Sequence, residues 1–171
     1  MAIRIITDSV ADVPKKIAEE LNIKILPLSV NFEDRSYKDG IEITADKLFE
    51  MIKKSKKLPT TSQITPGEFL KEFEEIIDSG DEAIVILMSA KLSGTYNSAI
   101  AARDLLETDK ITIIDSKAVT FGQGLMVIEA SRMVRKGFSR HQIADKVIYM
   151  RNNMVHKFIV DSLDYLKMGG R

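Results

Sequence analysis

Short apolar runs alternate along this chain with longer segments in which apolar residues recur every three or four positions. The short runs, which we predict to be β-strands, are 3–6, 24–32, 83–88, 111–114 and 158–160. The longer segments, which we predict to be helices, are 14–21, 44–52, 65–80, 94–106, 122–136 and 139–152. Residues 33–40 predict a turn with a short edge strand. The alternation is typical of an α/β domain, so we expect a mainly parallel sheet between helices.

The clearest helix signal is TPGEFLKEFEEIIDSG, residues 65–80. Thr65 and Glu68 form a capping box there, and Pro66 occupies the first turn. The following run, 83–88, is continuously apolar rather than alternating, as expected for a strand that helices cover on both faces.

Two other helices have weaker start signals. We expect Asp12 to cap the first helix, with Pro14 in its first turn, and Thr44 to cap the second.

Polar residues follow four of the predicted strands. They are Asp8 and Ser9, Ser89, Asp115 and Ser116, and Asp161 and Ser162. Ligands of open parallel sheets bind beyond the carboxyl ends of the strands, so these residues predict a polar rim around a site. The alternative is that each residue only caps the turn or helix that follows it.

The stretch SAKLSGTYNSA, residues 89–99, places Ser93, Gly94 and Thr95 where a helix begins. A helix start presents free N–H groups and a partial positive charge, and a glycine lets a ligand approach the backbone. Together with the hydroxyls, this arrangement suits a carboxylate or a phosphate. The alternative is that Ser93 is only the helix cap.

A second hydroxyl-rich stretch, LPTTSQITP, precedes the helix at 65–80. Because Thr65 already serves as the cap, Thr60, Thr61, Ser62 and Gln63 need another explanation. Prolines at both ends predict an ordered loop, and its donors favour a share in the same anion site, with Gln63 as a candidate for the polar rim.

The composition limits the classes of function. The chain has 171 residues, 44% of them apolar and 29% charged, which is typical of a soluble globular domain. Equal numbers of basic and acidic residues, 25 each, argue against general attraction to nucleic acid. The basic run KKSKK (53–57) lies at a predicted helix end, where cations complement the helix dipole. With no cysteine and no signal-peptide or membrane-spanning pattern, we expect a cytoplasmic protein.

Catalytic motifs are sparse. The sequence has no Gly-x-Ser-x-Gly elbow and no phosphate-binding P-loop. Its two histidines, His141 and His156, are far apart and follow no metal-ligand spacing, so we expect no metal site. The short GQG motif at 122–124 is better explained by close helix–sheet packing than by dinucleotide binding. The chain is therefore better equipped to hold an anion than to transform it.

Five segments in order resemble the DegV family and together span nearly the whole chain. They are TDSVADVP (7–14), LPTTSQITPGEF (58–69), MSAKLSGTYNSA (88–99), IIDSKAVTFGQG (113–124) and LDYLKMGGR (163–171). The resemblance implies a three-layer α/β/α head-group-binding lobe with a mainly parallel sheet, here residues 1–160. It also implies that residues 161–171 begin the connection to a second α/β lobe, which is largely absent from this chain.

The resemblance further implies a protein that binds long-chain, palmitate-like fatty acids in a tunnel between the lobes. The carboxylate would be held by the two hydroxyl stretches, here Thr61, Ser62, Ser93, Gly94 and Thr95, with Arg171 near the head group. Such a protein needs no cofactor beyond the bound acid and is not itself an enzyme. It would present the acid to a separate kinase subunit, which makes the acyl phosphate.

Family members usually continue beyond the Gly-Gly-Arg motif, where this chain stops. We therefore expect this portion alone to bind fatty acid weakly or not at all, because one wall of the tunnel would be missing. Two alternative functions stay open at this point. One is an acyl- or phosphoryl-transfer enzyme with Ser93 as nucleophile, and the other is a regulatory module that docks another protein.

Overall fold

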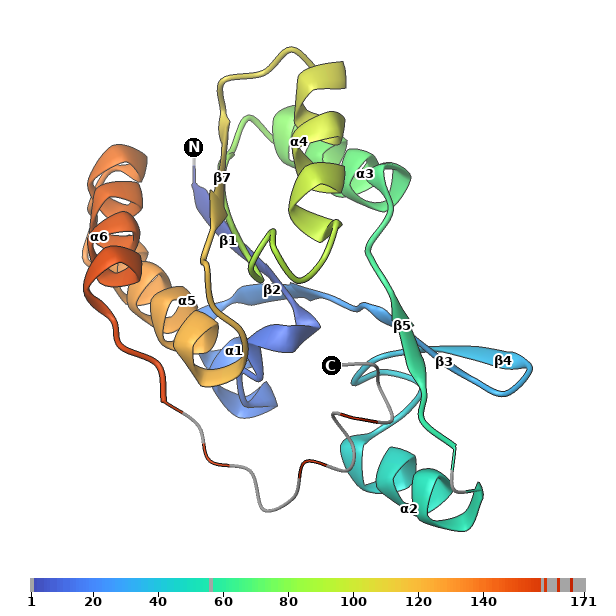
Figure 1. Ribbon diagram of the computed structural model, residues 1–171. Helices are drawn as coiled ribbons and strands as arrows, with labels where there is room; N and C mark the ends of the chain where they lie inside the picture. The colour runs from blue at the N-terminus through green and yellow to red at the C-terminus, as the bar shows by residue number, and fades with distance from the viewer. Residues whose placement is uncertain (1, 56, 158, 160–162, 164–166, 168–171) are drawn as a thin grey trace.

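The computed structural model of the protein describes residues 2–55, 57–157, 159, 163 and 167. Its centre is a four-stranded sheet with the order β2-β1-β6-β7, in which each neighbouring pair is parallel (Figure 1). The strands are β1 (Ile3–Asp8), β2 (Ile23–Leu26), β6 (Glu82–Leu87) and β7 (Ile111–Asp115). The predicted parallel sheet is confirmed.

Helices cover both faces of this sheet, as Figure 1 shows. They are α1 (Lys15–Leu21), α3 (Pro66–Asp78), α4 (Thr95–Leu105), α5 (Thr120–Arg135) and α6 (Arg140–Asn153). Successive strand residues point to opposite faces, so Ile5 and Ile84 pack with α1, α5 and α6, whereas Ile6 and Val85 pack with α3 and α4. The two buried clusters make the three-layer α/β/α architecture that was expected.

The start of α3 confirms the predicted capping box. The Thr65 side chain accepts a hydrogen bond from the Glu68 N–H, and the Glu68 carboxylate accepts one from the Thr65 N–H. The apolar stripe that follows buries Phe69, Phe73 and Ile76 completely against the sheet.

A second, smaller sheet lies beside the first and is antiparallel, with the order β4-β3-β5. Its strands are β3 (Ser29–Phe32), β4 (Arg35–Lys38) and β5 (Thr60–Ser62), and α2 (Ala45–Ser55) lies next to it in Figure 1. Strand β4 confirms the edge strand predicted within 33–40. The sheet as a whole has no counterpart in the predictions.

The prediction of one strand over 24–32 is wrong, because two strands of different sheets occupy it. Strand β2 pairs with β1 as far as Leu26, and β3 begins at Ser29 in the smaller sheet. Pro27 between them has no N–H and a fixed φ, so it cannot continue the ladder. The next N–H, of Leu28, donates to the Ser9 hydroxyl at 3.1 Å instead.

Two further local predictions are wrong. Residues 60–62, expected in a loop, form β5, because they pair with β3. Asp12 does not cap α1, since its own backbone is left-handed at φ 49° and the N-cap of α1 is Pro14, which makes no side-chain cap bond. The Thr44 cap is confirmed as a long hydrogen bond of 3.4 Å from the Lys47 N–H. The predicted last strand at 158–160 and the boundary at 160–161 fall largely outside the described residues.

Candidate functional site

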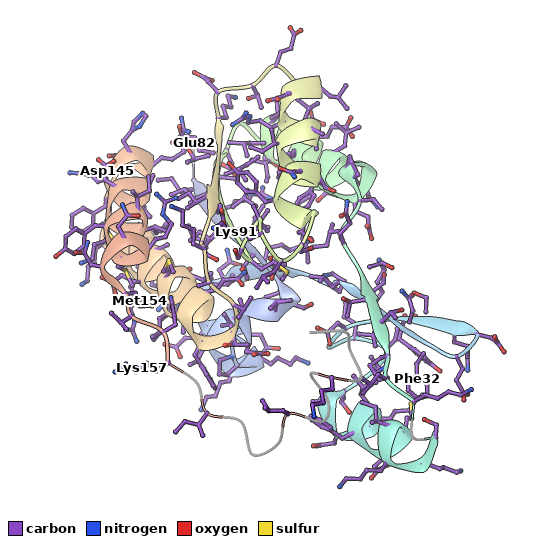
Figure 2. All side chains as sticks on the ribbon, in the orientation of Figure 1. Phe32, Glu82, Lys91, Asp145, Met154 and Lys157 are labelled. Atoms are coloured by element: carbon purple, nitrogen blue, oxygen red, sulfur yellow. The ribbon has the colours of Figure 1, made fainter. Side chains whose placement is uncertain are left out.

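The candidate site lies beyond the carboxyl ends of β1, β6 and β7, which the parallel pairing brings to one edge of the larger sheet. Figure 2 labels Glu82 at the start of β6 and Lys91 in the loop beyond its end, so the site lies on the Lys91 side. This placement confirms that the polar strand ends Asp8, Ser89 and Asp115 share one edge.

A cavity of about 540 Å³ at this edge joins the two hydroxyl-rich stretches of the sequence. It is lined by Val10, Leu28, Thr61, Gln63, Met88, Leu92, Ser93, Gly94, Val119 and Thr120. Half of this lining is aliphatic or thioether, and the polar side chains come from β5 and the residue after it, from the loop before α4 and from the start of α5. The cavity can therefore take a molecule with a polar head and an apolar body.

Ser93 stands immediately before the start of α4. Its Oγ lies 2.9 Å from the Thr95 hydroxyl and accepts a hydrogen bond of 3.2 Å from the Thr95 N–H. Thr95 is fully buried and is not part of the cavity lining, so it holds the Ser93 hydroxyl from the side away from the cavity. The N-cap of the helix is Gly94, so Ser93 stands one residue outside the cap position.

Thr61 lies in the middle of β5, where its side chain shares a face with its cross-strand partner Val30. This face borders the cavity. Ser62 points to the opposite face, because successive strand residues alternate, and its hydroxyl accepts a hydrogen bond of 2.8 Å from the Asn31 amide. The structure thus brings Thr61 together with Ser93 and separates Ser62 from both.

Gln63, expected as a rim residue, reaches from the end of β5 to the start of α4. Its Nε2 donates to the Ser98 hydroxyl at 2.9 Å, and its side chain lies directly over the Cα of Gly94. A Cβ on Gly94 would overlap the Gln63 Oε1 and lie 2.8 Å from its Cδ. The φ of Gly94 is an ordinary −73°, so a side chain at this position is restricted by the Gln63 amide, which would have to move, and not by the backbone.

Asp8 is fully buried beneath the cavity. Its carboxylate accepts hydrogen bonds from the Met88 N–H at 2.8 Å, the Val10 N–H at 3.1 Å and the Gln123 amide at 3.0 Å. Burial raises the pKa of Asp8 above its ordinary value of 3.8, although these hydrogen bonds act in the opposite direction. Because Val10 and Met88 line the cavity, Asp8 holds the backbone of its apolar wall and makes no direct contact with its interior.

The other predicted rim residues also stabilise loops. Ser9 accepts a hydrogen bond from the Leu28 N–H. The Asp115 carboxylate accepts two, from the Ala90 N–H at 3.1 Å and the Lys117 N–H at 2.9 Å, and Ser116 is buried in a turn with Ala118. The bonds of Asp115 to Lys117 and of Ser116 to Ala118 fit the capping alternative, whereas those of Ser9 to Leu28 and of Asp115 to Ala90 join distant loops, and contact of this rim with a ligand stays a prediction.

Two residues at this edge were missed from the sequence. Gln123 in α5 is fully buried and bonds Thr7 and Asp8, while its Oε1 has no partner among the described residues. Thr120 lines the cavity with a left-handed φ of 51°, which is rare for a β-branched residue. A buried glutamine and a strained threonine leave no pattern in a sequence, so only the fold could reveal them.

Two glycines of the GQG motif allow close packing, but their close contacts are with the turn at Ala11 and with His156 and not, as had been predicted, with the sheet. A Cβ on Gly124 would overlap the carbonyl oxygen of Ala11, and one on Gly122 would overlap the imidazole of His156. The part of the chain that the structure describes holds no group of three potential metal ligands and no helix able to cross a membrane. Arg171, expected near the head group, lies outside the described residues.

A larger cavity of about 860 Å³ lies elsewhere, between α1, β2 and the segment 39–45. Its lining includes Asp12, Lys15, Glu19 and Asp39, and none of the residues of the two hydroxyl stretches. We therefore place the candidate site in the smaller cavity, where the hydroxyls and the helix start converge.

Comparison with known proteins identifies the family and the fold of this chain. The model of the DegV family, described as a family of uncharacterised proteins, matches residues 2–171. A DegV domain-containing protein of Caldanaerobacter subterraneus is 38% identical over 169 residues, which cover 99% of this chain and 60% of the relative. The chain thus spans about 60% of the length of that relative.

Two solved structures share the fold over the whole chain. A fatty-acid-binding DegV family protein from Thermus thermophilus has a TM-score of 0.91 and 32% identity, with 61% of its own length covered. A stearic-acid-binding protein from Eubacterium ventriosum has a TM-score of 0.87 and 34% identity, with 60% of its length covered. Both similar proteins are thus described as binders of fatty acids.

Proposed function

The chain belongs to the DegV family, and from that premise we propose that it binds the head group of a long-chain fatty acid in the cavity at the edge of the larger sheet. The observation that carries this proposal is the meeting of Thr61 and Ser93 in one cavity, although Thr61 lies in β5 of the smaller sheet and Ser93 in the loop between β6 and α4. The fatty-acid-binding proteins of similar structure support the choice of ligand.

The cavity offers polar groups to the carboxylate of a fatty acid and apolar side chains to its tail. The Thr61 and Ser93 hydroxyls and the start of α4 can donate hydrogen bonds to a carboxylate, each contributing about 1–3 kcal/mol. Val10, Leu28 and Met88 offer apolar surface to the first methylenes of the chain. Each buried methylene contributes about 0.8 kcal/mol, so the tail supplies most of the affinity. The contacts of the head group then set the orientation of the bound acid.

Nucleophilic chemistry at Ser93 is the weaker alternative. The hydrogen-bond partners of Ser93 Oγ within the described residues are the Thr95 hydroxyl and N–H, neither of which is a base. A serine nucleophile needs an adjacent general base, and the predicted anion-holding role needs none. In the proposed function the protein binds the acid and presents its carboxylate to a separate kinase subunit.

The binding proposal can be tested with stearate. Stearate should bind in a titration, with the low affinity expected of this portion alone, and denaturing extraction with mass spectrometry of the purified protein identifies any fatty acid that copurifies. Thr61→Ala and Ser93→Ala should each weaken stearate binding by about 1–3 kcal/mol. Thr60→Ala removes a hydroxyl from the same strand but outside the cavity lining, and should leave the affinity unchanged.

Equal affinities for Thr61→Ala and Thr60→Ala would contradict the proposed site. A covalent acyl-serine on the wild-type protein would favour the enzyme alternative instead. Presentation to a kinase is tested separately, by acyl-phosphate formation with the partner. We expect Ser93→Ala to reduce that rate more than it reduces binding, because phosphoryl transfer depends on where the carboxylate points.

A further inference from the structure

The two hydroxyls of the site reach it from units that are built separately. Thr61 belongs to β5 of the antiparallel sheet, and Ser93 precedes α4 of the larger unit. Both side chains line the same cavity, so their separation depends on how the smaller sheet is fixed against α4. A carboxylate bound by both hydroxyls would be sensitive to any shift between them.

One side chain connects these two segments at the cavity itself. Gln63 follows β5 directly, and its Nε2 donates to the hydroxyl of Ser98, which is only 3% exposed, in the first turns of α4. Its Oε1 and Cδ lie over the Cα of Gly94, where a Cβ would have no room. The amide is thus held by a hydrogen bond on one side and by backbone contact on the other.

We propose that Gln63 is a positioning residue that sets the distance between Thr61 and Ser93, and that Gly94 is a glycine in order to admit its amide. The expected effect on ligand binding rests on the proposed function, but the contact of Gln63 with Ser98 and Gly94 is independent of it. Gly94 has an ordinary φ of −73°, so an alanine there is restricted by Gln63 and not by the backbone. Gln63 is an exposed residue, so its replacement leaves the buried core intact.

A double-mutant cycle tests the proposal with stearate as the probe. Gly94→Ala should weaken stearate binding about three- to tenfold, because the new Cβ pushes the Gln63 amide away from Ser98. Gln63→Ala should weaken binding by a similar factor, since β5 loses the same tie. In the Gln63→Ala background, Gly94→Ala should add less than about twofold, because the overlapping atoms are gone.

Two controls separate positioning from general damage. Gly67→Ala makes the same change in the first turn of α3, where a Cβ meets nothing within 4 Å, and should leave the affinity unchanged. The long-chain alcohol of the same length lacks the carboxylate but keeps the tail. We expect Gly94→Ala to weaken binding of the alcohol much less than binding of stearate, a difference that simple destabilisation would not produce.

Hydrogen exchange at β5 tests the contact without any ligand. Gln63→Ala should accelerate exchange of the amides at 60–62, and adding Gly94→Ala should change that rate no further. If wild type fails to bind stearate while exchange follows this pattern, the proposed function is wrong and the coupling stands. Additive effects of the two substitutions on binding and exchange would overturn the positioning role.

Discussion

The two sheets of this protein differ in how much of their surface is buried. In the larger sheet, residues 83–87 of β6 are completely buried, and helices cover both faces. In the smaller sheet, all three residues of β5 are exposed, and α2 beside it has no buried residue. Figure 2 labels Phe32 in this smaller unit, where it is one of the few buried side chains.

This contrast matters because each sheet supplies one half of the candidate site. Ser93 is held by a fully packed scaffold through the buried Thr95, whereas Thr61 depends on a strand with little packing of its own. The geometry of a site at such a junction depends on the contacts that fix the exposed strand β5 to the packed unit that carries Ser93. The following predictions test the difference between the two units, from the largest expected effect to the smallest.

Replacing a buried phenylalanine of the larger unit should have the largest effect. Phe69 in α3 is fully buried and its ring lies 5.6 Å from that of Phe73, so we expect Phe69→Ala to lower the free energy of unfolding by about 3–5 kcal/mol. Phe49→Ala in α2 makes the same change at a side chain that is 62% exposed, and should cost less than about 1 kcal/mol. Urea denaturation of both variants measures the difference. Similar costs would show that the two units are equally packed.

Hydrogen exchange should report the same contrast without mutation. We expect the amides of β6 to be protected at least about 100-fold more than those of β5, because opening β6 requires disruption of two buried clusters. The measurement is native-state exchange resolved by peptide or by residue. Equal protection would mean that the smaller sheet unfolds only with the whole protein.

Substituting the buried carboxylate beneath the site should have an intermediate effect. Asp8→Asn replaces an acceptor oxygen by an NH₂ group that faces N–H donors, and should cost about 1–3 kcal/mol. Asp34→Asn, which makes the same change of charge at an exposed turn position, should have little effect on stability.

The pH dependence of this variant has a defined sign. Because burial raises the folded pKa of Asp8 above 3.8, the folded state binds the Asp8 proton more tightly than the unfolded state. The contribution of Asp8 to stability is therefore greatest at pH values below 3.8, the ordinary pKa of the group, and is lost as the pH rises through the raised pKa of the folded state. Wild type should lose stability relative to Asp8→Asn over this window in urea titrations. A relative gain with rising pH would contradict the assignment.

The smallest effect should come from the helix caps. Thr65→Ala removes the cap of α3 together with its capping box, and should cost about 1 kcal/mol. Thr44→Ala removes a longer cap bond of 3.4 Å from α2 and should cost less than half as much. Thermal unfolding of the two variants gives the comparison, and an equal loss would show that the caps of both units matter alike.

Local chemistry was enough to predict most elements of the larger unit, but not the end of β2 or the cap of α1. The continuous apolar run of β6, the stripe of α3 and the Thr65–Glu68 box each depend on neighbours within a few positions. Such signals are readable along the chain because each fixes its own secondary structure, and parallel strands joined by helices then leave few alternative arrangements. The sequence also pointed to Thr61, because Thr65 already served as the cap of its helix, and to Ser93, because it stands beside a glycine where a helix begins.

Tertiary structure alone decided the contacts between distant segments. Pro27 divides one apolar run between two sheets, and β5 becomes a strand only because β3 is there to pair with it. The same holds for Gly94, whose neighbour turned out to be Gln63, and for the buried amide of Gln123. A residue's partner across the fold leaves no periodicity in its own neighbourhood, and for this reason the junction between the two units could be found only in the folded chain.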